Sequence, residues 1–249
     1  LINLGQGTER VESALQKWFA DTPMVRIDHD TTRRKGSLQE KLADVRRGEK
    51  QLLIGTQMLA KGHDFPGVTL VVMLDIDHGL FGTDFRASER MAQQLMQVAG
   101  RAGRGDKPGR VLIQTHHPEH PLLQLLIQQG YEAFARLALQ ERQQACFPPF
   151  SYQALMRAEA NNAELPEVFL RDARKLASSL ESSAIDFWGP VAAVMQRKAG
   201  QHRFHLLLQS TSRRYLHDFL DDWLEQINQL PSAKKVRWNI DIDPQDFYS

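Results

Sequence analysis

Short, mostly apolar segments alternate with amphipathic ones through the first half of the chain, and this alternation constrains the fold more than any other feature. Segments of strand length bounded by glycine, proline or polar residues predict buried strands at 24–27, 52–55, 68–74 and 109–114. Helical spacing of apolar residues predicts helices at 8–20, 37–47 and 86–97. Strands without a polar face occur in parallel sheets that helices cover on both sides. We therefore predict a doubly wound, parallel α/β domain, closed by one or two helices from 118 to 145.

The pattern changes after the proline pair Pro148 and Pro149, which aromatic residues flank. Two prolines favour a stiff, extended connector, so we place a domain boundary there and expect domains 1–150 and 151–249; a helix stop packed by its aromatic residues is the alternative. The second domain is predicted to contain strand, helix, strand, strand, helix and strand at 152–160, 164–180, 187–196, 203–209, 213–230 and 236–242. This order is that of a split β-α-β motif, a small antiparallel α+β sheet with two helices on one face.

Composition excludes several classes of protein. The formal net charge is only +1, so a nucleic-acid-binding surface would have to be local. Cys146 is the single cysteine, which rules out an internal disulfide and fits a reducing compartment. No run of apolar residues is long enough to span a bilayer. We expect a cytoplasmic protein that makes no membrane contact.

Residues 97–104 read QVAGRAGR and carry the strongest chemical signal in the chain. On a helix, Gln97, Arg101 and Arg104 would project from one face, because residues three and four apart are neighbours there. Small residues between them allow another surface to approach closely. Arginine presents a planar fork of donors to phosphate oxygens, so the pattern indicates phosphate recognition; a solvated basic helix end is the alternative.

A second signal follows the strand expected at 52–55. Thr56, Gln57 and Lys61 lie where ligands of open α/β sheets bind, outside the carboxyl ends of the strands. A threonine and a lysine there can hold backbone phosphates of a nucleic acid. Asp64, after Gly62, can accept a ribose hydroxyl. Taken alone this signal is weak, because many turns contain glycine and aspartate.

Together, the two segments resemble motifs V and VI of superfamily 2 helicases, which belong to the second RecA-like lobe. The strings KGHDFPGV at 61–68, LDID at 74–77 and DFRASER at 84–90 closely resemble the more specific family of primosomal protein N′, the bacterial replication-restart DNA helicases. GTER at 7–10 and DIDP at 241–244 fit the same family, so the resemblance covers essentially the whole chain. It implies a RecA-like lobe followed by a small, S10-like C-terminal domain.

The resemblance also implies a role for each matching residue. Arg104 would be the arginine finger on the γ-phosphate of ATP, with Arg101 beside it and Gln97 in support. Asp64 and Gly62 would meet the nucleotide ribose. The DNA backbone would lie against Thr56 and Gln57, with Lys61 as a further contact.

The activity implied by the resemblance is ATP-dependent 3′–5′ helicase action in restarting stalled replication forks through primosome assembly. Implied partners are branched and single-stranded DNA, the tail of single-strand-binding protein and other primosome proteins. The sequence has no G-x-x-x-x-G-K-[ST] phosphate loop and no acidic box after a strand for magnesium. We expect this chain to be the C-terminal portion of a longer helicase whose upstream lobe holds ATP and magnesium, and whose upstream insertion holds zinc. This segment alone is expected to be inactive and to hold no metal.

Weaker features leave alternatives open. Arg197, Lys198 and Arg203 lie on the hairpin predicted after residue 187, where they would form a local basic patch for phosphate or a merely solvated hairpin. The histidines near 116–120 are interpreted as a solvated loop rather than a metal site. A rival function is a non-catalytic module that binds single-stranded DNA or the tail of single-strand-binding protein, with inert helicase motifs.

Overall fold

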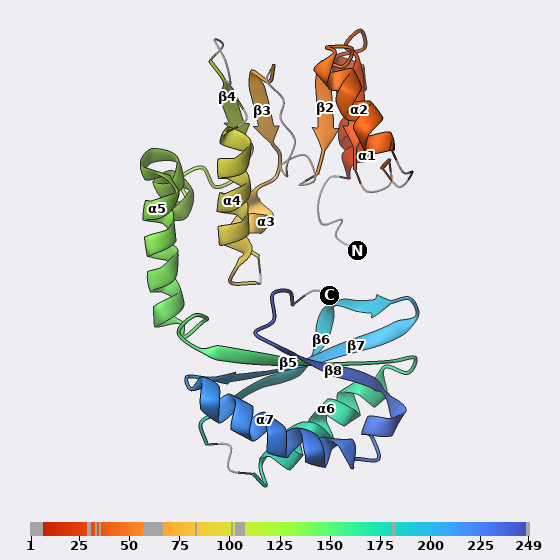
Figure 1. Cartoon of the computed structure of the whole chain (residues 1–249), viewed down its shortest axis with the longest axis vertical. Coiled ribbons are helices and arrows are strands. Elements are labelled where there is room, and N and C mark those ends of the chain that lie inside the picture. Colours follow the sequence, from red (N-terminus) through yellow and green to blue (C-terminus); the bar gives the residue numbers. More distant parts are fainter. Residues whose placement is uncertain are drawn as a thin grey trace. The chain divides into compact units, whose positions relative to one another are not determined.

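The computed structural model describes residues 7–28, 31–32, 34, 36–56, 67–82, 84–100, 102, 108–180 and 183–247 (Figure 1). The chain divides into two compact units, unit 1 (Leu1–Leu137) and unit 2 (Ala138–Ser249). The division falls within helix α5 (Pro121–Gln144). Gly130, which has a φ of 82°, interrupts α5, so this segment consists of two consecutive helices. The sequence predicted one or two helices here. In the part of the chain that is described, no helix combines the length and apolar character needed to cross a membrane.

Unit 1 begins with a small α/β layer built from four elements. These are α1 (Thr8–Trp18), β1 (Met24–Ile27), α2 (Ser37–Arg46) and β2 (Leu52–Gly55). Strands β1 and β2 are parallel, with Ile27 opposite Gly55. A small core forms between β1 and α2 from Val25, Ile27 and Leu42. The predicted strands and crossover helix are confirmed here, and Ile27 is completely buried.

The second part of unit 1 repeats the parallel arrangement. It contains β3 (Leu70–Met73), α3 (Asp77–Leu80), α4 (Ala87–Ala99) and β4 (Arg110–Ile113). Strands β3 and β4 are parallel, with Val72 opposite Leu112, and α4 contacts both of them. Among the described residues the four strands form two parallel pairs rather than the single sheet that we predicted. Strand direction and the helical crossovers agree with the prediction, whereas continuity of the sheet does not.

Unit 2 has the predicted β-α-β-β-α-β order. Its elements are β5 (Tyr152–Ala160), α6 (Glu164–Ala177), β6 (Asp186–Lys198), β7 (Gln201–Ser210), α7 (Arg213–Asn228), a 3-10 turn η2 (Ala233–Lys235) and β8 (Arg237–Ile242). The strands form an antiparallel sheet in the order β6-β7-β5-β8. Figure 1 shows α6 and α7 together on one face of this sheet, which confirms that prediction.

Alternation along the strands explains why the helices cover that face. Ala154, Met156 and Ala158 of β5 point into the core that α6 and α7 complete, while the intervening residues point to the other side. Trp223 of α7 is completely buried and its indole Nε1 donates to the Ala173 carbonyl of α6 at 2.9 Å. A buried aromatic side chain whose polar atom is satisfied locks the two helices together.

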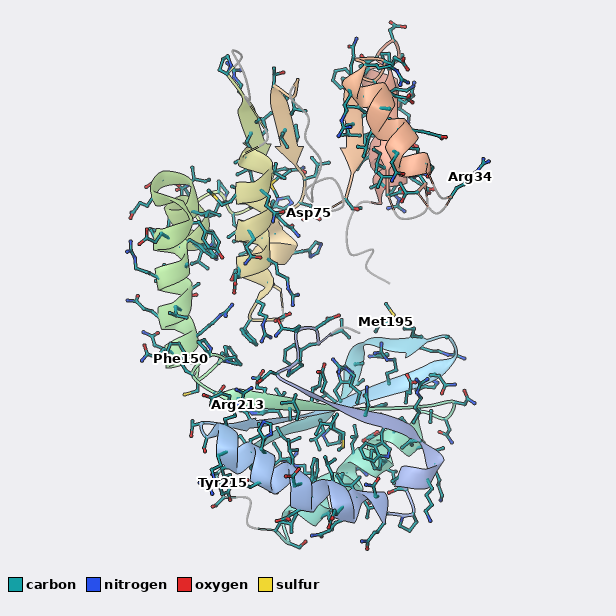
Figure 2. The ribbon with its side chains drawn as sticks, viewed as in Figure 1. Arg34, Asp75, Phe150, Met195, Arg213 and Tyr215 are labelled. Carbon is teal, nitrogen blue, oxygen red and sulfur yellow. The ribbon has the colours of Figure 1, made fainter. Side chains whose placement is uncertain are left out.

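The β6–β7 hairpin turns at the place that the sequence predicted. Ala199 and Gly200 both have positive φ, 50° and 83°, as a two-residue turn of the primed type requires. At the start of α7, Ser212 is the N-cap and its hydroxyl accepts from the Tyr215 amide at 3.2 Å. Nearby, the Arg213 guanidinium lies 3.1 Å from Asp243, next to the chain's C-terminal segment (Figure 2).

Candidate nucleotide and nucleic-acid interface

Helix α4 carries the first part of the arginine motif. Its buried residues Met91, Ala92 and Leu95 form the stripe that packs on unit 1, and this packing fixes the rotation of the helix about its axis. Gln97 lies in the last turn and is exposed to solvent. Arg101 and Arg104 lie outside the described residues. The structure therefore supplies the helix that leads to the predicted arginines, while their roles stay predictions.

A buried carboxylate anchors the beginning of α4. The Asp84 side chain is completely buried; its Oδ1 accepts from the Arg86 amide at 2.9 Å and its Oδ2 lies 2.9 Å from Arg90 Nη2. Asp84 precedes the N-cap Arg86, and a carboxylate near the N-terminus of a helix also interacts favourably with the helix dipole. Sequence reasoning used Asp84 only as part of a family string and missed this positioning role. An aspartate two residues before the predicted start of the helix at 86 was the available signal.

Close contact between α3 and α4 depends on glycine. A Cβ at Gly79 would lie 2.4 Å from Met91 Cβ, so only glycine lets the two helices approach as they do. Asp77, at the start of α3, accepts from the Thr115 hydroxyl and from the His116 amide, the latter at 3.0 Å. These bonds lower the pKa of Asp77 below its usual value, with the threonine bond as the largest cause. Residues after β3 and after β4 are thereby joined at the carboxyl end of both strands.

The histidine loop that follows β4 packs against an aromatic ring. His117 and His120 lie edge-on to Phe81, with ring centroids 4.6 and 5.4 Å away. No cluster of histidine, cysteine, aspartate and glutamate able to hold a metal ion is found among the residues that the structure describes.

The DNA-contacting segment predicted after β2 is described only at its beginning. Thr56 is exposed and directly follows Gly55, the last residue of β2. Gln57, Lys61, Gly62 and Asp64 lie outside the described residues. Because β1 and β2 are parallel, Thr56 lies at the same edge of the sheet as the residues that follow β1.

A polar cluster that sequence reasoning missed occupies this edge. Asp28 Oδ2 accepts from the Thr8 hydroxyl at 2.7 Å and Oδ1 from the Thr31 amide at 2.8 Å. Arg26 Nε lies 3.4 Å from the same carboxylate and 3.3 Å from Glu12. The hydrogen bond from Thr8 and then that from the Thr31 amide lower the pKa of Asp28 to about 2, against the opposing effect of burial.

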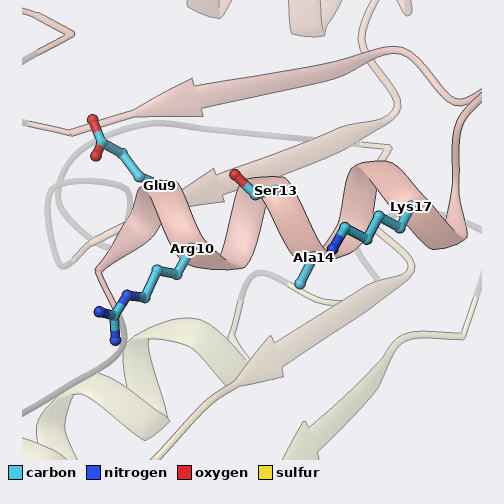
Figure 3. Close-up of a pocket in the computed structure, with 5 residues that line it drawn as sticks. All are labelled: Glu9, Arg10, Ser13, Ala14 and Lys17. Carbon is cyan, nitrogen blue, oxygen red and sulfur yellow. The ribbon is translucent and has the colours of Figure 1, made fainter.

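This cluster joins α1 to β1. Thr8 is the first residue of α1 rather than its N-cap, which is Gly7. The helix buries none of its residues completely, and the Thr8–Asp28 bond and the ion pairs of Arg26 with Glu9 and Glu12 attach it to β1. On its outer side, Glu9, Arg10, Ser13, Ala14 and Lys17 line an open hollow (Figure 3).

In unit 2, the structure separates the three residues of the predicted basic patch. Arg197 and Lys198 are exposed near the tip of the β6–β7 hairpin. Arg203 is only 8 % exposed, and its Nε lies 4.0 Å from Glu159 on the neighbouring strand β5. Arg203 therefore lies within the sheet face, whereas the other two lie at the surface.

Two family models match separate parts of the chain. Residues 2–106 match the helicase conserved C-terminal domain, and residues 143–245 match the primosomal protein N C-terminal domain. The first match covers unit 1 from α1 through α4, and the second covers the antiparallel sheet of unit 2.

Relatives with the same name match nearly the whole chain. Replication restart protein PriA of Haemophilus influenzae is 47% identical over 246 residues, which cover 99% of this chain and 33% of that protein. PriA of Synechocystis sp. is 39% identical and that of Bacillus subtilis 36%, each over 96% of this chain and over 28% and 30% of the relative. The chain thus spans about a third of the length of these relatives. With a helicase C-terminal domain followed by a primosomal C-terminal domain, the chain belongs to the PriA family of replication restart proteins.

Proposed function

We propose that this chain supplies the second motor lobe and the C-terminal domain of an ATP-dependent 3′–5′ DNA helicase that restarts stalled replication forks. One observation carries the proposal: a helicase C-terminal domain is joined to a primosomal C-terminal domain in a chain that matches PriA proteins over 96–99% of its length. Unit 1 is then a RecA-like lobe and unit 2 an S10-like domain.

In this proposal, the arginine motif stabilises charge during phosphoryl transfer. Arg104 acts as the finger on the γ-phosphate of ATP, Arg101 lies beside it and Gln97 supports both. Gly62 and Asp64 meet the ribose. Exposure of Gln97 at the end of a helix whose rotation is fixed by packing supports the idea that the motif faces a ligand.

The residues of this chain would complete, but not build, the ATP site. The sequence has no phosphate loop, so the triphosphate and its magnesium ion would be held mainly by residues from the rest of a full-length protein. When bound, magnesium would neutralise charge on the phosphates. Zinc would be held outside this chain, and this segment by itself should not hydrolyse ATP.

DNA contacts are proposed for both units. In unit 1, Thr56, Gln57 and Lys61 would hold the backbone of a single strand at the edge of β2. In unit 2, Arg197 and Lys198 of the β6–β7 hairpin would contact DNA phosphates. Branched DNA, the tail of single-strand-binding protein and other primosome proteins are the proposed partners, in the bacterial cytoplasm at the nucleoid.

A chimera tests the motor assignment. The matching third of Haemophilus influenzae PriA is replaced by this chain, and DNA-stimulated ATP hydrolysis is measured for the chimera, its Arg104→Ala variant and an Arg136→Ala control. Arg136 is an exposed arginine of α5 whose ion pair with Glu132 lies within one helix. We expect Arg104→Ala to reduce hydrolysis by about 10³-fold or more, as arginine fingers do, and the control to hydrolyse ATP normally.

Two results would contradict the proposal. Hydrolysis by the Arg104→Ala chimera at the parent rate would remove the finger role. Robust, DNA-stimulated hydrolysis by the 249-residue chain alone would show a phosphate site within it and refute the division of the ATP site.

A further inference from the structure

A buried ion pair holds the beginning of helix α4. The Asp84 side chain is completely buried, and its Oδ2 lies 2.9 Å from Nη2 of Arg90, whose side chain is 42 % exposed. Its other oxygen accepts from the Arg86 amide at 2.9 Å. Such pairs add little net stability, because the cost of removing the charges from water offsets their attraction. Their best-attested use is to fix one arrangement of the elements that they join.

Two glycines bring α4 into close contact with the segment before it. A Cβ at Gly79 would lie 2.4 Å from Met91 Cβ, and one at Gly82 would lie 2.6 Å from the Ala87 side chain. The Asp84 carbonyl also accepts from the Ala87 amide at 2.8 Å. The ion pair, the backbone bond and this packing together fix both the rotation of α4 about its axis and its position along that axis.

The segment that packs on α4 is itself attached to the residues after strand β4. Figure 1 shows this segment, helix α3, beside α4. Asp77, the first residue of α3, accepts from the Thr115 hydroxyl and from the His116 amide, the latter at 3.0 Å. The first part of α4 is therefore held by two carboxylates, those of Asp77 and Asp84, at the carboxyl ends of β3 and β4.

The last turn of α4 has no comparable contacts. All buried residues of the helix lie at or before Leu95. Helical geometry nevertheless continues, since Gly100 has a φ of −67° and its amide donates to the Met96 carbonyl at 3.0 Å. Gln97, where the arginine motif begins, is exposed in this turn. The placement of the motif is therefore set by the buried first part of the helix.

A small tilt of α4 at its buried end would move the motif by a distance that matters to catalysis. The 13 residues of the helix span about 20 Å, at about 1.5 Å per residue. A tilt of about 3° would displace the far end by about 1 Å. Misplacement by about 1 Å can slow an enzymatic reaction about 100-fold, even when the altered residue is far from the reacting atoms.

We propose that Asp84 is a positioning residue for phosphoryl transfer, and that its ion pair with Arg90 fixes α4 so that Arg101 and Arg104 reach the triphosphate. The inference rests on the proposed function, in which those arginines act on ATP. In this role Asp84 touches neither the nucleotide nor DNA. Its loss slows the chemical step and leaves the binding of ATP and DNA unchanged.

The chimera with Haemophilus influenzae PriA tests the proposal through Asp84→Asn. Asparagine keeps the size of the side chain and an acceptor for the Arg86 amide, but it removes the charge beside Arg90. We expect kcat of DNA-stimulated hydrolysis to fall about 10- to 100-fold. KM for ATP and Kd for single-stranded DNA should stay within about threefold of the parent values. Asp44→Asn is the matched control and should leave kcat unchanged, because it breaks an aspartate–arginine pair on the surface of α2.

A double variant separates positioning from a loss of folded protein. If Asp84 acts through the arginines, Asp84→Asn should lower the single-turnover rate of the Arg104→Ala chimera less than about twofold, because residues that act as a unit are not additive. A change that only reduced the folded fraction would multiply with Arg104→Ala instead. Gly79→Ala displaces α4 without removing a charge and should give the same pattern, so it carries the test if Asp84→Asn does not fold.

The outcomes that would overturn the positioning role differ from those that would overturn the motor assignment. Parental kcat in folded Asp84→Asn and Gly79→Ala chimeras, beside an inactive Arg104→Ala chimera, would refute positioning alone. So would an effect confined to KM or Kd, or equal factors for Asp84→Asn in the parent and in the Arg104→Ala background. Hydrolysis at the parent rate by the Arg104→Ala chimera would refute the proposed function, and the positioning role with it.

Discussion

Replacing Asp28 with asparagine tests whether one buried carboxylate holds α1 on unit 1. The carboxylate accepts from Thr8 and Thr31 and lies beside Arg26. These contacts favour its charged form and lower its pKa from 3.8 to about 2. A difference of nearly two pKa units corresponds to roughly 2 kcal/mol of unfolding free energy at neutral pH.

The sign of the pH dependence follows from the lowered pKa. Since the folded state holds the Asp28 proton less tightly than the unfolded state, the stabilisation is fully present above about pH 4 and is lost as the pH falls towards 2. In Asp28→Asn this part of the acid sensitivity should disappear, because the amide does not titrate.

Hydrogen exchange measured by mass spectrometry can follow α1 and β1 separately from unit 2. At pH 7 we expect amides of α1 to exchange about 30-fold faster in Asp28→Asn, the rate equivalent of ~2 kcal/mol. Asp44→Asn is the matched control, because that carboxylate pairs with Arg47 on the surface of α2. Exposed pairs within a helix contribute about 0.5 kcal/mol or less. Exchange of α1 within about threefold of the parent chain, or equal effects of the two substitutions, would refute the reasoning.

Two further predictions concern packing and protonation. Gly79→Ala places a methyl group 2.4 Å from Met91 Cβ and should lower the unfolding free energy, measured by urea titration, by about 1–3 kcal/mol. Gly67→Ala is the control and should change the unfolding free energy little, because a Cβ there meets nothing within 4 Å. Similar effects of both substitutions would contradict the packing argument. His205 has a pKa lowered to about 4 by burial first and then by two arginines, so the unfolded state takes up its proton at higher pH. Stability of unit 2 should therefore fall as the pH drops from about 6.5 to 4, and His205→Gln should flatten that fall in thermal melts; an unchanged pH profile would count against it.

Local patterns were enough to predict most elements of unit 2. Alternating apolar residues placed β5 and β8, helical spacing placed α6 and α7, and the Ala199–Gly200 pair placed the hairpin turn. Each of these signals is short-range, because side-chain direction repeats every two residues in a strand and about every 3.6 in a helix. The order of the elements then limited the sheet to few topologies.

Other features depend on residues that are far apart in the chain. The sequence predicted that a helix begins at Thr8, but the bond from the Thr8 hydroxyl to Asp28 depends on the packing of α1 beside β1. In the sequence, Asp84 served only as part of a string that resembles the family. The complete burial of its side chain against Arg90 follows from the way α4 packs on the rest of unit 1. A local sequence pattern gives no information about contacts between residues that are far apart in the chain.

The sequence by itself determined the class of the fold, the positions of most helices and strands, and the family to which the motifs belong. Those conclusions depend on periodicity and on residue strings, both of which can be read along the chain. Only the tertiary structure decided that Arg203 and His205 are buried together with Arg157 on one side of a sheet while Arg197 and Lys198 remain in solvent. The reason is physical: burial and the pairing of charges are properties of strand register and of the layers that cover each face, and these arise only when distant segments pack together.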